Sequence, residues 1–260
     1  MNEIKDLHTY LSRMDKALLD KCWWIDKIAP EVDTVIDFGC AAGNLKSMID
    51  YLAPKKYKYI GIDTAPEMVN ECIHKGIRVY TSLSVALKHC KPENTIIVLN
   101  SVIHELLSYE AEPYKILRQI GNSKCRYIAI RDMCLTDIQL DNVDAIRNQI
   151  EHSKYANQWY EFRTICECTR QAPYNYLSVI EKEFLLKYWY TENWDREKYE
   201  QYLWTWAHDL WREEHVFMDY KIEDVEDFYI PFVRNKVQED FGIKYTELTH
   251  KKVLLQLRKD

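Results

Sequence analysis

The sequence predicts an α/β protein built on one open, mostly parallel β-sheet that carries a helical insertion. Three observations indicate this fold. Short aliphatic and β-branched runs alternate with helical patterns in 31–134, residues 135–214 are rich in aromatic and charged residues, and the alternation returns in 215–260. Such alternation is typical of right-handed βαβ units with helices on both faces of the sheet. We therefore divide the chain into N-terminal helices at 1–30, an α/β core at 31–134, a helical cap or insertion at 135–214, and C-terminal strands and a helix at 215–260 that complete the core.

The first half of the chain supplies alternating helices and strands. One or two amphipathic helices are expected first, and Pro30 ends them. The elements that this half predicts, in chain order, are helices within 6–29, a strand at 34–38, a helix at 44–52, a strand at 57–63, a helix at 66–75, a strand at 78–80, a helix at 83–90, a strand at 95–100, a helix at 112–120 and a strand at 126–131.

The second half of the chain differs in amino-acid composition. Residues 135–214 hold six of the eight tryptophans and are too long and too apolar for a loop, so we expect packed helices. These aromatic residues either form a core of their own or stack on a planar acceptor. Beyond them, 220–226 alternates as an edge strand does, 231–241 is helical with Gly242 as its stop, and 252–257 is a last strand.

Composition excludes several classes of protein. The 260 residues are 47% hydrophobic and 29% charged, which is typical of a globular protein and not of a disordered one. No apolar run approaches the roughly 20 residues of a membrane helix, and the first residues lack the apolar stretch of a secretory signal. We expect a cytoplasmic protein with no membrane partner. The net charge of −6 gives no global attraction for nucleic acid, although a local basic patch stays open.

The cysteines and histidines predict no metal site. The eight cysteines contain no C-x-x-C pair and lie mostly in apolar stretches, so we expect reduced thiols that pack as small hydrophobic groups. Cys166 and Cys168 are separated by one residue, which is not the usual zinc spacing. The eight histidines are scattered, and no two of them are four residues apart.

A glycine-containing loop follows the first predicted strand. Residues 37–44 read Asp-Phe-Gly-Cys-Ala-Ala-Gly-Asn, where an open parallel sheet binds its ligand. The spacing of Gly39 and Gly43 differs from the G-x-G-x-x-G of dinucleotide sites, and no Gly-Lys-Ser or Gly-Lys-Thr of a triphosphate loop follows. Asp37 suits a ligand with a cationic amine and repels phosphate.

A second carboxylate stands at the end of the second predicted strand. Asp63 lies twenty residues beyond Gly43, where a carboxylate can accept both ribose hydroxyls. The two strand ends together predict a site for an adenosine-like ligand that bears a cationic amino-acid portion in place of a pyrophosphate.

The residues of these two strand ends resemble the class I S-adenosylmethionine-dependent methyltransferases. Residues 35–43, Val-Ile-Asp-Phe-Gly-Cys-Ala-Ala-Gly, match D-x-G-x-[GA]-x-G, and Ile-Gly-Ile-Asp follows at 60–63. Residues 101–105 and 127–133 are similar to a bacterial and phage-type branch of that superfamily. The resemblance implies a Rossmann-like methyltransferase fold, a mostly parallel seven-stranded sheet with a reversed last strand.

The resemblance also implies a cofactor, S-adenosyl-L-methionine, and a role for each site residue. It makes 31–134 the cofactor-binding core. By position, Asp37, Gly39, Cys40, Ala41 and Gly43 would line the methionine part, Asp63 would hold the ribose, Thr64 and Met68 would lie against the adenine, Ser82 and Leu83 would flank the base, and Asn100 and Ser101 would sit beside the reactive methyl group.

Two further residues are candidates for catalysis. Methyl transfer is an in-line displacement, and a base is needed only if the acceptor is protonated. His104 can take that proton or instead cap or pack the following helix, and Glu105 is a second candidate for a base or acceptor contact. We expect Arg131 and Asp132 to form an ion pair that fixes the end of the fifth strand.

The sequence therefore predicts a methyltransferase that acts on an unidentified acceptor, either a small molecule or a nucleotide or RNA. A non-catalytic S-adenosylmethionine-binding or partner protein is the first alternative. An NAD-dependent oxidoreductase shares the sheet and the ribose carboxylate, but the glycine spacing disfavours it.

Overall fold

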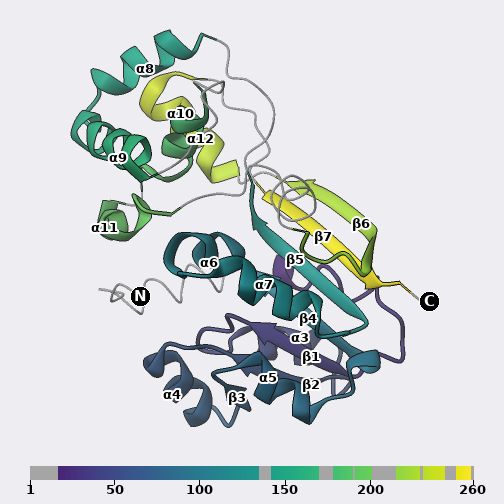
Figure 1. Cartoon of the computed structure of the whole chain (residues 1–260). Coiled ribbons are helices and arrows are strands. Elements are labelled where there is room, and N and C mark those ends of the chain that lie inside the picture. Colours follow the sequence, from purple (N-terminus) through teal and green to yellow (C-terminus); the bar gives the residue numbers. More distant parts are fainter. Residues whose placement is uncertain are drawn as a thin grey trace.

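The structure, a computed structural model, describes residues 17–134, 142–169, 178–189, 191–200, 215–228, 231–243 and 250–258. Its sheet has seven strands in the order β3-β2-β1-β4-β5-β7-β6 (Figure 1). The strands are β1 (Thr34–Phe38), β2 (Lys58–Ile62), β3 (Val79–Tyr80), β4 (Thr95–Asn100), β5 (Tyr127–Met133), β6 (Tyr220–Phe228) and β7 (His250–Leu257).

The pairing of the strands confirms the predicted fold class. β1 to β5 run parallel, whereas β7 lies antiparallel between β5 and β6. The reversed last strand and the position of β6 at the edge are both as predicted. β5 continues two residues beyond its predicted end, because Asp132 and Met133 pair with the start of β7.

Both faces of the sheet are covered, which explains the continuous apolar runs in the strands. Ile97 and Leu99 of β4 belong to one core cluster, and Ile96 and Val98 belong to the other. All four are completely buried, as expected for a central parallel strand. Helices α3 (Leu45–Leu52) and α4 (Pro66–His74) contribute to the second cluster; α5 (Leu83–Ala86), α6 (Ile103–Tyr109) and α7 (Pro113–Gly121) contribute to the first.

Helix α6 is an element that the sequence did not predict. Its N-terminus is capped by Asp132 of β5, whose Oδ2 accepts hydrogen bonds from the amides of Ile103 (2.6 Å) and His104 (3.3 Å). A cap normally precedes its helix directly. Here the capping residue lies 28 residues further along the chain than His104, so no local sequence pattern predicts the helix.

The N-terminal segment is less helical than predicted within the described residues. Only α2 (Leu18–Lys21) is an α-helix, and turns follow it; residues 1–16 of the expected helices lie outside the described residues. Cys22, Trp24 and Ile28 are buried in the cluster that α3 shares. Tertiary packing of these side chains outweighs the helical pattern here.

The insertion has a hydrophobic core of its own, and Figure 1 shows its helices gathered in a lobe beyond one end of the sheet. Trp159, Phe162 and Phe184 are completely buried in this core. Its helices are α8 (Val143–Glu151), α9 (Ala156–Thr169), α10 (Ser178–Lys187) and α11 (Trp194–Glu197). The aromatic residues at 201–214 lie outside the described residues. None of the described helices has the length and apolarity needed to cross a bilayer.

Helix α12 (Pro231–Phe241) differs from its predicted place. The sequence assigned it to the α/β core together with the last strands. In the structure, Val237 and Phe241 are buried in the core of the insertion instead. The C-terminal segment is therefore shared between two units, since β6 and β7 complete the sheet while α12 packs with the insertion.

Candidate active site

The loop after β1 is shaped by two left-handed glycines. Gly39 has φ +75°, and a Cβ there would lie 2.7 Å from Cγ2 of Val102. Gly43 has φ +70°, and a Cβ there would lie 2.6 Å from Cδ1 of Ile77. A side chain at either position would be strained by the left-handed backbone and would force the neighbouring Val102 or Ile77 to shift, which favours glycine at both. The loop is anchored to β2, since the amides of Gly39 and Cys40 donate to the carbonyl of Ile62 at 2.8 and 3.0 Å.

Asp63 clamps this loop to the end of β2. Its Oδ2 accepts the amide hydrogen of Ala41 at 2.8 Å, and its Oδ1 accepts that of Ala65 at 2.9 Å. Burial raises the pKa of Asp63, and the backbone hydrogen bonds oppose that rise. Each oxygen keeps a further lone pair for a ligand hydroxyl.

Asp37 lies buried at the end of β1. The hydroxyl of Tyr59 donates to its Oδ2 at 2.5 Å. Burial raises the pKa of Asp37 to about 6, while the hydrogen bond and the charge of Lys21 oppose that rise. The carboxyl therefore still ionises near neutral pH and can attract a cationic group.

Two cavities open at this edge of the sheet. The larger has a volume of about 620 Å³. Nine of the residues that the sequence assigns to the cofactor line it: Gly39, Ala41, Asp63, Thr64, Met68, Ser82, Leu83, Asn100 and Ser101. A small cavity of about 20 Å³ adjoins it and is lined by Asp37 and Cys40, with Gly39, Ala41 and Asn100 shared between the two. Gly43 lines neither and acts on the shape of the loop.

The side chain of Asn100 lacks hydrogen bonds among the described residues. Its Nδ2 and Oδ1 are both buried, and neither has a partner there. The residue lines both cavities at the end of β4. A buried amide without partners is costly, so this position suits a polar ligand that supplies them.

The comparisons with known proteins agree with this geometry. Residues 20–171, more than half of the chain, match the family described as "Methionine biosynthesis protein MetW". The chain belongs to the MetW family. No curated protein matches this MetW-family chain.

Solved structures show the same fold as this MetW-family chain. A SAM-dependent methyltransferase from Archaeoglobus fulgidus superposes with a TM-score of 0.51 at 13% identity, over 96% of this chain and 100% of the other. The plantazolicin methyltransferase BamL, in complex with a triazolic desmethylPZN analog and SAH, gives a TM-score of 0.50 at 12% identity, over 97% and 87%. The predicted resemblance to class I methyltransferases is confirmed at the level of the fold.

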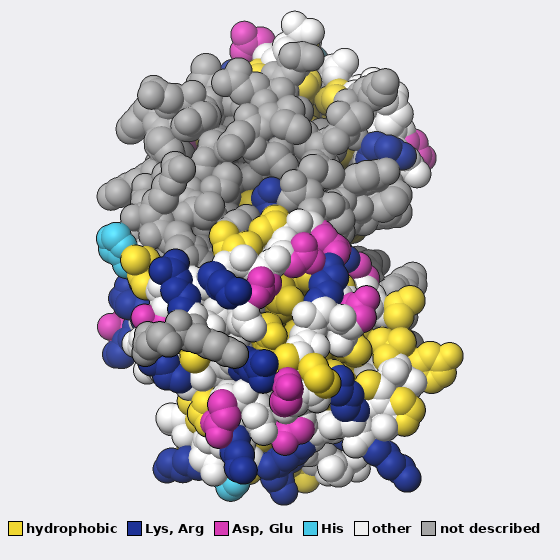
Figure 2. Space-filling view, turned by 90° about the vertical axis from the view of Figure 1, so that its right-hand side faces the viewer, with side chains coloured by type: hydrophobic (Ala, Val, Ile, Leu, Met, Phe, Trp, Pro, Cys, Tyr) yellow, Lys and Arg dark blue, Asp and Glu magenta, His cyan; other side chains and the backbone are white. Residues whose placement is uncertain are grey.

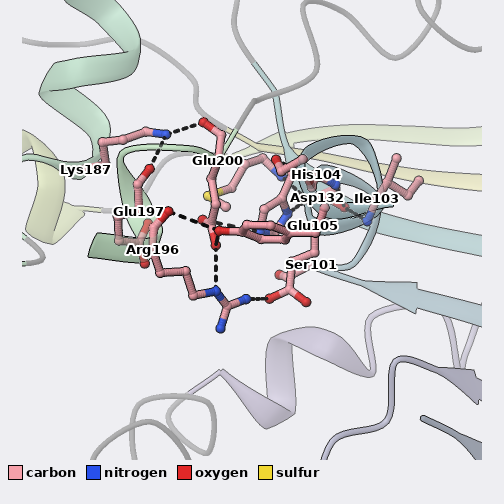
Figure 3. A network of polar contacts seen from close by, with 12 residues as sticks. Ser101, Ile103, His104, Glu105, Asp132, Lys187, Arg196, Glu197 and Glu200 are labelled. Carbon is pink, nitrogen blue, oxygen red and sulfur yellow. Dashed lines mark hydrogen bonds and ion pairs between the residues drawn. The ribbon is translucent and has the colours of Figure 1, made fainter. Parts of the chain in front are cut away.

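His104 of this MetW-family protein is held inside the protein and lines neither cavity. Its Nδ1 lies 2.5 Å from Oδ1 of Asp132, and its Nε2 lies 3.9 Å from Oε2 of Glu200 (Figure 3). Burial alone lowers the pKa of His104, but the carboxylates of Asp132, Glu200 and Glu105 outweigh it and raise the pKa to about 9. The imidazole is therefore charged at neutral pH, which disfavours the predicted role of a base.

The ion pair predicted between Arg131 and Asp132 does not form. Asp132 pairs with His104, and Nε of Arg131 donates instead to Oδ2 of Asp20 at 2.7 Å. The reason is register along β5, because neighbouring residues of a strand point to opposite faces of the sheet.

Glu105 lines the larger cavity and pairs with the insertion. Arg196 lines the same cavity, and its Nη2 donates to Oε1 of Glu105 (Figure 3). Nε of Arg196 lies 3.1 Å from Oε1 of Glu200, which also accepts the hydroxyl of Tyr109 at 3.2 Å. Burial raises the pKa of Glu105, and the charges of Arg196 and His104 oppose that rise.

Sequence reasoning missed Arg196 and Glu200. Both sit in or just after α11, 91 residues from the positions that they contact on α6, and no local motif marks them. Glu200 completes a cluster with His104 and Glu105, in which one side-chain nitrogen or oxygen atom of each residue lies within 4.8 Å of the others. The sequence predicted no metal site, and Arg196 supplies a positive charge to both glutamates of this cluster.

Proposed function

We propose that this protein is an S-adenosylmethionine-dependent methyltransferase. The observation that carries the proposal is the amide of Asn100, which has no hydrogen-bond partner among the described residues and lines both cavities beside the loop of Gly39. A polar ligand that enters between the loop and β4 would satisfy this amide without displacing a protein hydrogen bond. The residues at the neighbouring strand ends fit the parts of the cofactor.

The residues that would hold the cofactor divide by strand. We assign the ribose hydroxyls to Asp63, whose oxygens each keep a lone pair. We assign the cationic amine to the buried carboxylate of Asp37. The remaining assignments are the base to Thr64, Met68, Ser82 and Leu83, the methionine part to Gly39, Cys40 and Ala41 with Gly43 shaping the loop, and the methyl end to Asn100 and Ser101.

When bound, S-adenosylmethionine supplies a methyl group on a positively charged sulfur. The protein's task is to exclude water and to orient the acceptor. We propose Glu105 as the residue that contacts the acceptor, because it lines the cavity and its raised pKa lets it take a proton closer to neutral pH. We propose His104 as a positioning residue, which holds α6 between Asp132 and Glu200.

The acceptor that we propose is a small molecule without phosphate. Among the described residues that line the larger cavity, Arg196 is the one basic side chain, and it already pairs with Glu105 and Glu200. The acidic lining residues are Asp63, Glu67, Glu105 and Glu110. A phosphate would meet a like charge here. On the described part of the face in Figure 2, Lys and Arg side chains lie among Asp and Glu side chains.

Calorimetry tests the cofactor assignment. We expect S-adenosylhomocysteine to bind the full chain and NAD not to bind. Asn100→Ala should weaken the binding of S-adenosylhomocysteine, whereas Asp50→Asn, on the exposed side of α3, should not. Tight binding of NAD alone would contradict the proposal and favour the oxidoreductase.

A labelled-methyl screen tests the reaction. Cell extract is separated into RNA, protein and small molecules, and we expect label in the small molecules. Glu105→Gln should reduce that transfer and leave the affinity for S-adenosylhomocysteine unchanged. Label in RNA would contradict the acceptor class. Cofactor binding without transfer to any fraction would identify the non-catalytic alternative.

A further inference from the structure

Two cysteines face each other between the loop after β1 and helix α4. Sγ of Cys40 lies 4.0 Å from Sγ of Cys72. Both are buried, with 5% and 0% of their surface exposed. The thiol of Cys72 also donates to the carbonyl of Ala41 at 3.2 Å. The pair thus connects the proposed cofactor loop to a helix of the core.

The packing around the pair holds the two sulfurs toward each other. A Cβ at Gly61 would lie 2.7 Å from Sγ of Cys40, and a Cβ at Gly43 would lie 3.1 Å from Sγ of Cys72. Two glycines therefore leave the space that the thiols fill. A disulfide bond needs the sulfurs about 2 Å closer than they are, a shift that rotation of the side chains and a small movement of the loop can supply.

A small oxidant can reach Cys40 of this pair. Cys40 lines the cavity of about 20 Å³, which shares Gly39, Ala41 and Asn100 with the larger cavity. That volume is enough for one water-sized molecule, and hydrogen peroxide is only slightly larger than water. The hydrogen bond to Cys40 and the charge of Lys75 lower the pKa of Cys72, whose sulfur lies 4.0 Å from that of Cys40.

We propose that Cys40 and Cys72 form a peroxide-sensitive dithiol that closes to a disulfide and weakens cofactor binding. The effect on binding rests on the proposed function, but the formation of the disulfide does not. One thiol of the pair loses its proton, and its thiolate attacks one oxygen of hydrogen peroxide and becomes a sulfenic acid, while the other oxygen leaves as hydroxide and takes that proton to form water. The other thiol of the pair then attacks the sulfenic sulfur, and a second water leaves. Two thiols and one peroxide thus give one disulfide and two waters.

The closed disulfide would pull Cys40 toward α4 and displace its neighbours in the loop. Ala41 is directly affected, because its amide donates to Asp63 while its carbonyl accepts from Cys72. Loss of the Ala41 clamp would move the loop away from Asp63. We expect this displacement of the binding loop to lower the affinity for S-adenosylhomocysteine about tenfold or more.

The experiment uses the full chain and hydrogen peroxide. The treated protein is denatured, its free thiols are blocked with N-ethylmaleimide, and its peptides are mapped by mass spectrometry. We expect a peptide that joins Cys40 to Cys72, an affinity for S-adenosylhomocysteine about tenfold or more below that of the reduced protein, and recovery with dithiothreitol. Cys72→Ser should keep its affinity after peroxide, whereas Cys90→Ser, a half-buried cysteine elsewhere, should lose affinity as the wild type does.

Two results would overturn the proposal. One is that both thiols remain free in the treated wild type, which the mapping decides even if a variant fails to fold. The other is that Cys72→Ser loses as much affinity as the wild type on treatment. If the reduced protein does not bind S-adenosylhomocysteine at all, the proposed function is wrong, while a mapped disulfide would still support the dithiol.

Discussion

The carboxyl edge of the sheet and the insertion form two walls of the same cavity in different ways. At the sheet edge, backbone amides make the contacts, since the Ala41 amide donates to Asp63 and the Gly39 amide donates to the carbonyl of Ile62. At the insertion, side-chain charges make the contact between Arg196 and Glu105, residues 91 positions apart. The first wall is a property of a short motif, whereas the second is a property of tertiary packing. Asp132 and His104 lie where the two walls meet.

The largest effect that we predict is at this meeting point. Asp132→Asn removes the carboxylate that lies 2.5 Å from the buried His104 and weakens the cap of α6. Removing one member of a buried pair costs about 3–5 kcal/mol. Urea unfolding should show a loss of this size, and Asp50→Asn serves as the control, because Asp50 is half-buried and its ion pair with Lys46 lies at the surface. Equal stability of the two variants would show that the two walls do not depend on this pair.

The pH dependence of stability tests whether His104 is charged in the folded protein. The pKa of His104 is raised to about 9 in the folded protein, above the unfolded value of about 6.5. A raised pKa means that the stabilisation is complete below about pH 6.5 and is lost as the pH rises through about 9. We expect the stability difference between wild type and His104→Gln to shrink from pH 6 to pH 10 in urea titrations. A difference that is constant over this range would contradict the charged state of His104.

On the sheet-edge wall alone, Asp63→Asn should weaken cofactor binding. Each hydrogen bond to a charged group contributes about 1.5–3 kcal/mol, which corresponds to roughly 10-fold to 150-fold in affinity. Calorimetry with S-adenosylhomocysteine measures the change. Glu67→Gln is the matched control, because Glu67 is acidic and lines the same cavity but has no assigned contact. The same loss in both variants would point to overall charge and not to the ribose contact.

A comparison of Gly39 with Gly76 distinguishes the cost of a left-handed backbone from the cost of close packing. Gly39 and Gly76 both have positive φ, but a Cβ at Gly76 would meet nothing within 4 Å. Alanine at either position should cost about 1–2 kcal/mol for the left-handed conformation. Only Gly39→Ala should in addition disturb Val102 and reduce the binding of S-adenosylhomocysteine. Similar binding by both variants would mean that the loop tolerates a side chain.

The smallest effect on cofactor affinity is predicted for the insertion wall. Tyr109→Phe removes the hydroxyl that donates to Glu200 and to the carbonyl of Arg196. One of these two acceptors is a carboxylate, and a hydrogen bond to a charged group contributes about 1.5–3 kcal/mol, so urea unfolding should show a loss of up to this size while cofactor affinity stays the same. Tyr51→Phe, at an exposed tyrosine, should change neither. A large loss of cofactor affinity in Tyr109→Phe would show that the insertion acts on the cofactor itself.

The same contrast explains what the sequence could predict. Strand alternation and the spacing of Gly39, Gly43 and Asp63 are local, so the mostly parallel sheet could be predicted from them. The resemblance to class I methyltransferases implied the reversed last strand and nine residues that line the larger cavity. Helix α6 and the contacts of Arg196 were not, because a cap from β5 and a charge from α11 come from distant parts of the chain. The place of α12 was missed for a related reason, since its apolar face does not say which core it joins.

The measurement that tests the central claim most directly is a crystal structure of the full chain with S-adenosylhomocysteine. We predict that the nucleoside occupies the cavity of about 620 Å³, with its ribose on Asp63 and the amide of Asn100 hydrogen-bonded to the ligand. A ligand bound elsewhere, or an Asn100 amide that gains no ligand contact, would contradict the account.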